Sequence, residues 1–344
     1  VSKTKQGFIF ALLCLVALLL MFASCMIGSS AMSFETALQA LVSPLGIRLP
    51  FASNVGENET YIVLSLRLPR VLFAAVAGAG LAICGVAFQS IFRNPLSDPY
   101  VLGVSSGASL GVALFILGGP LLGFTASPLL TTLGTAGAAW LGAAAILALV
   151  ASVSRRIKDI MVILILGMMI GSAVSAIVQI LQYLSNEEAL KSFIVWTMGS
   201  LGDVTTSQLA LVAPAIIAGL IISVSVIKPL NLLLLGESYA RTMGLNIRRT
   251  RSLILLSTTL LAGTVTAFCG PIGFIGLAIP HVARILFCDA DHRTLLPAAA
   301  LTGAVSLLIC DIISKILVLP VNTITALLGI PIVIWVVIRN KSIV

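Results

Sequence analysis

Residues 160–184 read IMVILILGMMIGSAVSAIVQILQYL, and this stretch contains no Asp, Glu, Lys or Arg. A helix needs roughly 20 consecutive apolar residues to cross the hydrocarbon core of a bilayer, so the stretch is long enough to do so. Its polar side chains are neutral Ser, Gln and Tyr groups. The stretch therefore predicts a membrane-spanning helix.

The composition of the whole chain extends this prediction. Of its 344 residues, 59% are apolar and 9% are charged, and the mean hydropathy is +1.16. Soluble domains carry about 25% charged residues, and a soluble chain of this length cannot bury so much apolar surface in one core. The predicted fold class is all-α: a polytopic membrane protein that forms a single transmembrane domain over residues 1–344.

Apolar stretches between charged or Gly- and Pro-rich breaks predict ten membrane helices. The first follows Lys3 and Lys5, and it is longer than the apolar part of a signal peptide, so we interpret it as retained. Breaks are expected at Gly270–Pro271 and Ile279–Pro280. The predicted spans are 7–31, 61–91, 99–118, 127–153, 160–184, 207–226, 250–269, 274–287, 294–317 and 325–339.

The basic residues are distributed unevenly when the loops are assigned alternately to the two sides of the membrane. Fifteen of the twenty Lys and Arg residues fall on the side of the N-terminus. The positive-inside rule then places both termini in the cytoplasm. The net charge of +8 is explained by this topology, so no nucleic-acid partner is expected. The five basic residues on the other side are Arg48, Arg67, Arg70, Lys191 and Lys315.

A faint internal repeat accompanies this topology. Ala77-Gly78 is followed by Cys84-Gly85, and Ala262-Gly263 is followed by Cys269-Gly270 at the same spacing. The two copies lie in spans of opposite direction, as in an inverted-topology repeat. Small residues recur in any packed membrane helix, so chance is an equal explanation.

The most polar interior stretch, residues 236–251, lies on the predicted cytoplasmic side. It mixes small, acidic and basic residues, and it predicts short helices broken at Gly244. Such a surface suits a soluble cytoplasmic partner. An ordinary basic loop that only fixes topology is the alternative.

Two groups of charged residues lie at the predicted external ends of helices. Arg67 and Arg70 flank Pro69, which suits a first helical turn. Their guanidinium groups could pair with carboxylates of an external partner or extend to lipid phosphates. Asp311 and Lys315 lie one helical turn apart, and mutual neutralisation is the simpler interpretation of that pair.

Two further motifs concern turns and helix packing. Asn94-Pro-Leu-Ser-Asp-Pro99 contains two turn signals on the cytoplasmic side. The Gly- and Ser-rich stretch 103–109 follows it and predicts close helix packing, with an exposed backbone that lines a path as the alternative.

Several kinds of site are absent from the sequence. No phosphate-binding GxxxxGK[ST] loop occurs, nor an HExxH motif or a nucleophile elbow, so no enzymatic activity is predicted. The six cysteines show no metal-ligand or disulfide spacing, and no cofactor is expected. A relay of buried ionisable groups, which an ion-coupled transporter would need, is also missing.

The fifth predicted span offers a weakly polar lining for a path. A path of thioether, hydroxyl and amide groups could pass a large solute that is already coordinated, although core packing explains the same side chains equally well. The candidate residues are Met161, Met168, Met169, Ser172, Ser175, Gln179 and Gln182.

From about Arg67 to the C-terminus the chain resembles the FecCD-type permeases of binding-protein-dependent ABC importers. The resemblance rests on motifs in a fixed order across most of the chain. They are Arg67-Leu-Pro-Arg70, Asn94-Pro-Leu-Ser-Asp-Pro99, Leu102-Gly-Val-Ser-Ser-Gly107, Trp196-Thr-Met-Gly199, Leu235-Gly-Glu237, the segment from Gly270 to His281, and Leu328-Gly-Ile-Pro331.

The resemblance implies a ten-helix permease in the cytoplasmic (inner) membrane of a bacterium or archaeon. It implies a homodimer with the path on its two-fold axis, two copies of a separate cytoplasmic ABC ATPase, and an external solute-binding protein. It also implies roles for three sets of residues. These are Arg67, Arg70 and Lys315 for docking the binding protein; Leu235, Gly236, Glu237, Ala240, Arg241, Gly244 and Arg248, within the segment 235–251, for ATPase coupling; and Met161, Met168, Ser172 and Gln179 for the translocation path.

The family also suggests the type of cargo. A bulky metal chelate is expected, with a ferric siderophore or haem first and cobalamin next, and an oxyanion is a less common possibility. Two alternatives from other classes remain at this point. One is an ion-coupled secondary transporter or channel that acts without an ATPase, and the other is a membrane enzyme.

Overall fold

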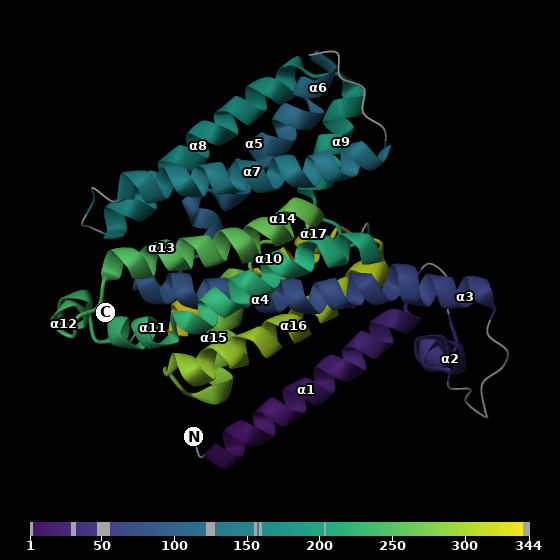
Figure 1. Cartoon of the computed structure of the whole chain (residues 1–344), viewed down its shortest axis with the longest axis horizontal. Coiled ribbons are helices and arrows are strands. Elements are labelled where there is room, and N and C mark those ends of the chain that lie inside the picture. Colours follow the sequence, from purple (N-terminus) through teal and green to yellow (C-terminus); the bar gives the residue numbers. More distant parts are fainter. Residues whose placement is uncertain are drawn as a thin grey trace.

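The computed structural model describes residues 3–28, 32–46, 56–121, 128–154, 157, 160–202 and 204–339. Every regular element in these ranges is helical. The helices form an elongated bundle in which most long helices run along the same direction (Figure 1).

The membrane helices agree with the ten predicted spans. Seven are long and apolar enough to cross a bilayer, and three shorter apolar helices complete the set in the described ranges. The long ones are α1 (Lys3–Met26), α4 (Leu68–Ile91), α7 (Pro128–Ser154), α8 (Ile160–Leu184), α10 (Thr206–Ser225), α13 (Ile247–Thr258), which continues through a π-helical turn (Thr259–Gly263) into α14 (Thr264–Cys269), and α16 (His292–Leu317); the shorter ones are α5 (Val104–Ile116), α15 (Ile275–Phe287) and α17 (Val321–Arg339).

Short helices also lie between these spans; the sequence predicted them in the polar stretch 236–251, and the others were not predicted because they are too short to give a span signal. One of them, α12, lies in the polar stretch 236–251; it is followed by Gly244 with a φ of +82° and then by α13, so the predicted break at Gly244 is confirmed. The short helices are α2 (Phe34–Val42), α3 (Glu57–Tyr61), α6 (Gly118–Leu121), α9 (Glu187–Thr197), α11 (Ile227–Leu234) and α12 (Glu237–Thr242).

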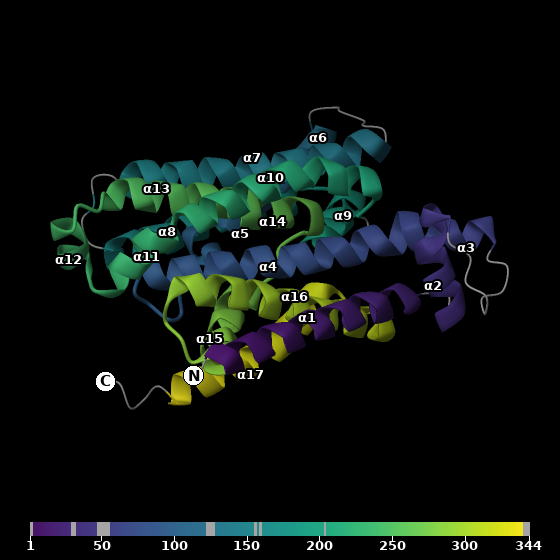
Figure 2. The same ribbon diagram turned by 60° about the horizontal axis from the view of Figure 1, so that its bottom comes forward.

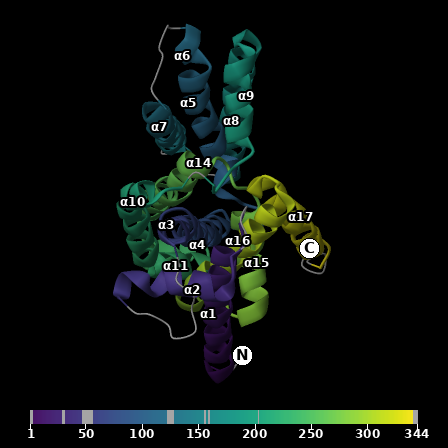
Figure 3. The ribbon, with the colours of Figure 1, turned by 90° about the vertical axis from the view of Figure 1, so that its right-hand side faces the viewer.

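Helix α4 is the centre of the bundle. In the end-on view it is surrounded by α10, α11, α15 and α16 (Figure 3). In its most apolar stretch 78% of the residues are buried, against 11% in α1. Glycines allow the close packing: Gly78 faces the backbone of Gly303 in α16, and Gly85 faces the carbonyl of Gly276 in α15. A side chain at either position would collide with that backbone.

Helices α5, α7, α8 and α9 form a second group, which extends from one side of the bundle (Figure 1, Figure 3). Gly107 of α5 faces the carbonyl of Gly142 in α7, and Gly111 faces that of Ala138. Gly171 of α8 lies beside Ser106. The prediction that the Gly- and Ser-rich stretch 103–109 serves close packing is therefore confirmed.

The predicted break at Gly270–Pro271 is present between α14 and α15. Gly270 has a φ of +72°, and Phe274 has a φ of +68°, which is uncommon for a bulky residue. Partners elsewhere in the chain satisfy the freed backbone groups. The Gly273 amide donates to Asn322 Oδ1 at 3.0 Å, and the Ser200 amide donates to the Cys269 carbonyl at 2.8 Å.

The second predicted break, at Ile279–Pro280, is wrong, because α15 continues through Pro280. Proline removes the amide that would bond to the carbonyl four residues earlier. That carbonyl belongs to Gly276 and faces Gly85 of α4. A packed neighbour therefore covers the group that proline leaves free, and the helix is tolerated.

The two ends of the bundle can be told apart by their elements. Helix α1 begins, and α17 ends, at the end that carries α12 (Figure 2). We call this the α12 end and the opposite one the Asp311 end. Both termini thus share one end, as predicted; its assignment to the cytoplasm stays a prediction. The inverted repeat also stays a prediction, since Gly78 and Gly85 lie at helix crossings whereas Gly270 terminates a helix.

Candidate transport and docking sites

A buried ion cluster joins three helices at the Asp311 end. Asp311 of α16 has no exposed side-chain surface, and Arg70 of α4 contacts its Oδ1 through Nη2 at 2.7 Å and Nε at 2.8 Å. Lys315 contacts Oδ2 at 2.8 Å, and Ser24 of α1 donates to the same oxygen at 3.0 Å. The predicted Asp311–Lys315 pair is confirmed, and Arg70 joins it. We call Ser24, Arg67, Arg70, Asp311 and Lys315 the Asp311 cluster.

The remaining cation of the cluster, Arg67, holds the last turn of α1. Its Nη1 donates to the carbonyls of Cys25 at 2.8 Å and Met26 at 2.9 Å. Lys315 donates to the Ser24 carbonyl at 3.1 Å. The last carbonyls of a helix lack intrahelical partners, and cations there are stabilising. Two of the residues predicted to dock a partner therefore also fix α1 to the bundle.

The three predicted docking residues do meet in one cavity of about 670 Å³. It opens beside Gly28, Ser200 and Gly202. Three cations and one carboxylate leave it with an excess of positive charge. The cations are largely enclosed, since Arg67 is 7% exposed and the side chains of Arg70 and Lys315 are 21% and 7% exposed. Sequence reasoning missed Ser24, which lies in an apolar helix with no signal to distinguish it.

The predicted path residues lie on one stripe of α8. Met161, Met168, Ser172 and Gln179 are all exposed. The Ser172 hydroxyl donates to the Met168 carbonyl at 2.9 Å, so its hydrogen is used within the helix. Buried residues on the other face of the helix, Gly167 among them, pack toward Leu102 and α5. This stripe is therefore a neutral, weakly polar surface along most of the helix. Of the other path candidates, Met169 and Ser175 are exposed and Gln182 is half-buried.

The predicted coupling residues lie on α12 and its flanks, at the α12 end. Leu235, Arg241, Gly244 and Arg248 are exposed, and Gly236, with a φ of +104°, turns the chain from α11 into α12. Glu237 pairs with Arg251 at 2.6 Å and with Arg241 at 3.5 Å. Ala240 differs from the others, because it is fully buried. It can only act by holding α12 in place.

A hydrogen-bond network at the same end was not predicted. The Asn231 side chain of α11 accepts from the backbone amide of His292 at 2.9 Å and donates to Asp291 at 2.6 Å. His292 Nδ1 lies 2.7 Å from Asn231 Oδ1, and Nε2 lies 2.7 Å from Ser90 Oγ. These contacts join α4, α11 and α16 behind the coupling residues. A single Asn, Ser or His in a sequence carries no signal for such a network.

Comparisons with known proteins agree with this architecture. The FecCD transport family matches residues 15–339. The hemin transport system permease protein of Yersinia pestis is 36% identical over 99% of this chain and 97% of its own length. The vitamin B12 import system permease protein of Salmonella typhi is 38% identical over 81% of this chain and 84% of its own.

A solved structure gives the same result in three dimensions. It is described as an inward-facing conformation of an ABC transporter of the metal-chelate type. Its TM-score is 0.82 at 30% sequence identity, and the match covers 97% of this chain and 99% of that one.

Proposed function

The chain belongs to the FecCD transport family, and from this premise we propose that two copies form a homodimeric permease that carries a bulky metal chelate between their α8 helices. Permeases of this family are multi-pass proteins of the inner membrane and work with a separate ATPase and a binding protein. The chain is therefore a transport subunit. The alternatives of a secondary transporter that acts alone and of a membrane enzyme are set aside.

The α8 stripe is the observation that carries the proposal. The stripe of Met161, Met168, Ser172 and Gln179 adds hydroxyl and amide groups to an exposed helix face, and it has no charge that would hold a passing ligand. Pairing two such faces across a two-fold axis would line a path with groups that contact a chelate weakly. A path must bind its cargo well enough to admit it and weakly enough to release it.

Haem is the cargo that we place first, together with ferric siderophores. The 36% identity to a hemin permease extends over nearly the whole of both chains, whereas the match to the vitamin B12 permease covers 81% of this chain. Cobalamin is therefore the second choice. The Met-rich, uncharged stripe could contact haem, a ferric siderophore or cobalamin without binding any of them tightly.

The external binding protein would dock at the Asp311 end. The cavity there combines Arg67, Arg70 and Lys315 with a single carboxylate, so it favours an acidic surface. Arg70 uses Nε and Nη2 for Asp311, and its Nη1 lies toward Gly202 at the mouth of the cavity. An incoming carboxylate could bind that atom without displacing Asp311.

The ATPases would dock at the α12 end, against the exposed residues Leu235, Arg241, Gly244 and Arg248. Movement of α12 would reach the path through α13, to which Glu237 is tied by Arg251. ATP binding can shift the permease between two conformations only as far as the ATPases bind them with different free energies.

Uptake into proteoliposomes tests the cargo. The chain is reconstituted with its ATPase and binding protein, and hemin, a ferric siderophore and cobalamin are offered separately. We expect ATP-dependent uptake of hemin or the siderophore. Uptake of cobalamin alone would overturn the order of cargoes, and uptake driven by an ion gradient without ATP would overturn the importer assignment.

Cysteine cross-linking tests the path. The exposed Cys14 and Cys288 are first replaced by Ser. Gln179→Cys is expected to cross-link between copies, whereas Ile217→Cys on the outer face of α10, which is 55% exposed, is not. Equal cross-linking at both positions, or none at Gln179, would contradict a dimer axis along α8.

Docking is tested by the binding of the binding protein to the permease in nanodiscs. Arg70→Gln is expected to slow association, and wild-type association should weaken as ionic strength rises. Arg249→Gln, the same change at the opposite end, is the matched control. Salt-independent association would contradict docking through these cations.

A further inference from the structure

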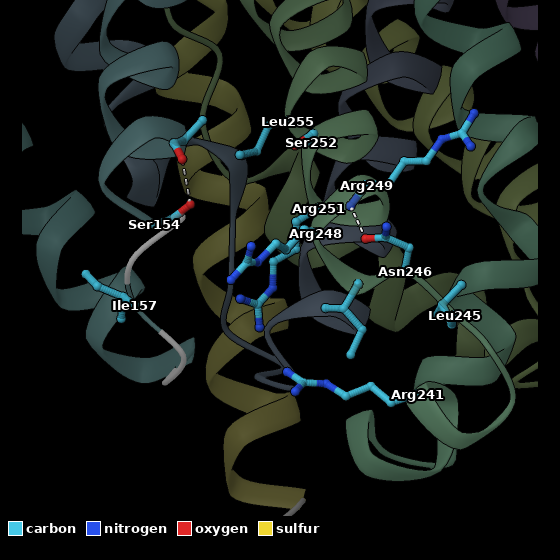
Figure 4. Close-up of a pocket in the computed structure, with 12 residues that line it drawn as sticks. Ser154, Ile157, Arg241, Leu245, Asn246, Arg248, Arg249, Arg251, Ser252 and Leu255 are labelled. Carbon is cyan, nitrogen blue, oxygen red and sulfur yellow. Dashed lines mark hydrogen bonds between the residues drawn. The ribbon is translucent and has the colours of Figure 1, made fainter.

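A second cavity, of about 880 Å³, lies at the α12 end. It is lined by Ser154 at the end of α7, by Ile157, and by the beginning of α13 (Figure 4). Arg241 of α12 closes one side. The cavity therefore lies between the coupling segment and the end of the second helix group.

The lining of this cavity carries a positive charge that the residues described by the structure do not neutralise. Arg241, Arg248 and Arg251 extend into the same space (Figure 4). Arg249 also borders the cavity, but its side chain extends in the opposite direction (Figure 4). Glu237 pairs with Arg241 and Arg251. Arg248 makes no ion pair with any residue in the described ranges. Within the described part of the chain, one carboxylate thus faces these three guanidinium groups.

Arg251 supplies a second indication of an anion-binding site. Its side chain is 16% exposed, and its Nε is buried with no hydrogen-bond partner in the part of the chain that the structure describes. A buried donor without a partner is costly. An anion bound at Arg248 and Arg251 could reach this atom.

Part of the cavity wall is apolar. Ala151 and Leu255 line it together with the arginines. A narrow crevice shares Ser154, Arg251 and Leu255 with the cavity and continues between helices, where its walls are apolar. Those walls are formed by Ile91, Phe92, Leu102, Val150, Ile163 and Ile254. The site is therefore cationic at its mouth and apolar inside.

We propose that this cavity binds an anionic phospholipid, with its phosphate on Arg248 and Arg251 and its glycerol and upper acyl chain against Ala151 and Leu255. Guanidinium groups bind phosphate through paired hydrogen bonds, and basic pockets between membrane helices on the cytoplasmic side hold anionic headgroups. Free phosphate would not use the apolar wall. The site requires neither the homodimer nor a particular cargo, but its cytoplasmic position rests on the proposed function, in which Arg248 also belongs to the ATPase surface.

Native mass spectrometry of the full transporter, with its ATPase, tests the site. The transporter is taken from nanodiscs of phosphatidylcholine and phosphatidylglycerol, and the lipids that stay bound are counted. We expect selective retention of phosphatidylglycerol. Arg248→Gln should lower it about fivefold, since each basic side chain near an anionic lipid contributes roughly that factor. The double change Arg248→Gln/Arg251→Gln should lower it further.

Arg249→Gln is the matched control, because it removes the same charge from the neighbouring residue that points away. An equal loss with Arg249→Gln, or no selective retention in the wild type, would overturn the proposal. Inorganic phosphate is titrated in parallel. If phosphate alone binds as tightly and displaces the lipid, the cavity is a free-anion site and the lipid assignment is wrong.

Discussion

The Asp311 end and the α12 end of this permease both gather arginines, but they use them differently. At the Asp311 end, Arg67, Arg70 and Lys315 are bound to a buried carboxylate and to the last carbonyls of α1. At the α12 end, Arg241 and Arg248 are exposed and Glu237 is the carboxylate near them.

The difference shows that the sequence alone does not tell whether a charged residue stabilises the fold or is available to bind a partner. Where a cation is buried with its partner, removing the partner leaves an unpaired charge that water cannot solvate, and this lowers the stability of the fold considerably. Where a cation is exposed, water replaces a lost partner, and the pair contributes little. Mutations at the Asp311 end should therefore mainly change the stability of the protein, and mutations at the α12 end should mainly change the binding of partners.

The largest effect is expected for Asp311→Asn. It leaves Arg70 and Lys315 without their common carboxylate, and breaking a buried pair in this way costs about 3–5 kcal/mol. The measurement is thermal unfolding of the purified chain in detergent. Adding Lys315→Met to the Asp311→Asn variant should restore part of the loss, because the two sites are coupled. An unchanged Tm would show that the Asp311 cluster does not hold the helices together.

A smaller effect is expected for Ser24→Ala. The hydroxyl donates to Asp311 at 3.0 Å and accepts from Lys315 at 2.7 Å. Hydrogen bonds to charged groups contribute about 1.5–3 kcal/mol, so the Tm should fall by roughly half as much as for Asp311→Asn. Ser225→Ala is the control and should leave the Tm unchanged, because the exposed Ser225 hydroxyl bonds to the Ile222 carbonyl of its own helix and to no other described residue.

Glu237→Gln at the α12 end should have a smaller effect on stability than Asp311→Asn. Its partner Arg241 has a side chain that is 59% exposed, and pairs of this kind contribute about 0.2–1 kcal/mol. Its partner Arg251 is 16% exposed, but Glu237 itself is 26% exposed, so water can reach the carboxylate, whereas Asp311 has no exposed side-chain surface. The same unfolding measurement applies. A loss as large as that of Asp311→Asn would remove the contrast between the two ends.

The smallest effect concerns Asp291, which caps α16 at the α12 end. Its pKa is lowered from the ordinary value of 3.8, first by the backbone amide of Arg293 and then by the Asn231 side chain. A carboxyl with a lowered folded-state pKa stabilises the fold above its unfolded pKa, and this stabilisation is lost as the pH falls through the folded value.

The Tm difference between the wild type and Asp291→Asn should therefore be present at neutral pH and shrink as the pH falls below 3.8. Asn keeps the cap but does not titrate. A difference that is constant with pH would contradict an ionised cap.

Much of the fold could be predicted because lipid imposes a simple rule. A stretch such as 160–184 has to be a helix in a bilayer, since every backbone group must be bonded within it, and α8 (Ile160–Leu184) has these bounds. The break at Pro280 was wrong, because whether a proline interrupts a membrane helix depends on what covers the freed carbonyl. Gly85 covers it here, and it lies far away in the sequence.

The sequence predicted which residues belong to the candidate sites, but it did not predict their contacts or their burial. Arg67, Arg70 and Lys315 were expected as exposed docking groups, and the structure encloses them with Asp311 and Ser24. Ala240 was expected among the coupling residues and is buried. The roles of these residues remain predictions, and their positions now indicate how each should be tested.

The sequence by itself determined the class, the number of spans, the shared side of the termini and the family. Each follows from local composition and from motifs that keep their order along the chain. Only the tertiary structure decided which charges are paired and which are free, because Ser24, Arg70 and Asp311 come from three different helices. Pairing depends on the distance between side chains, and that distance is set by helix packing, which no single stretch of sequence contains.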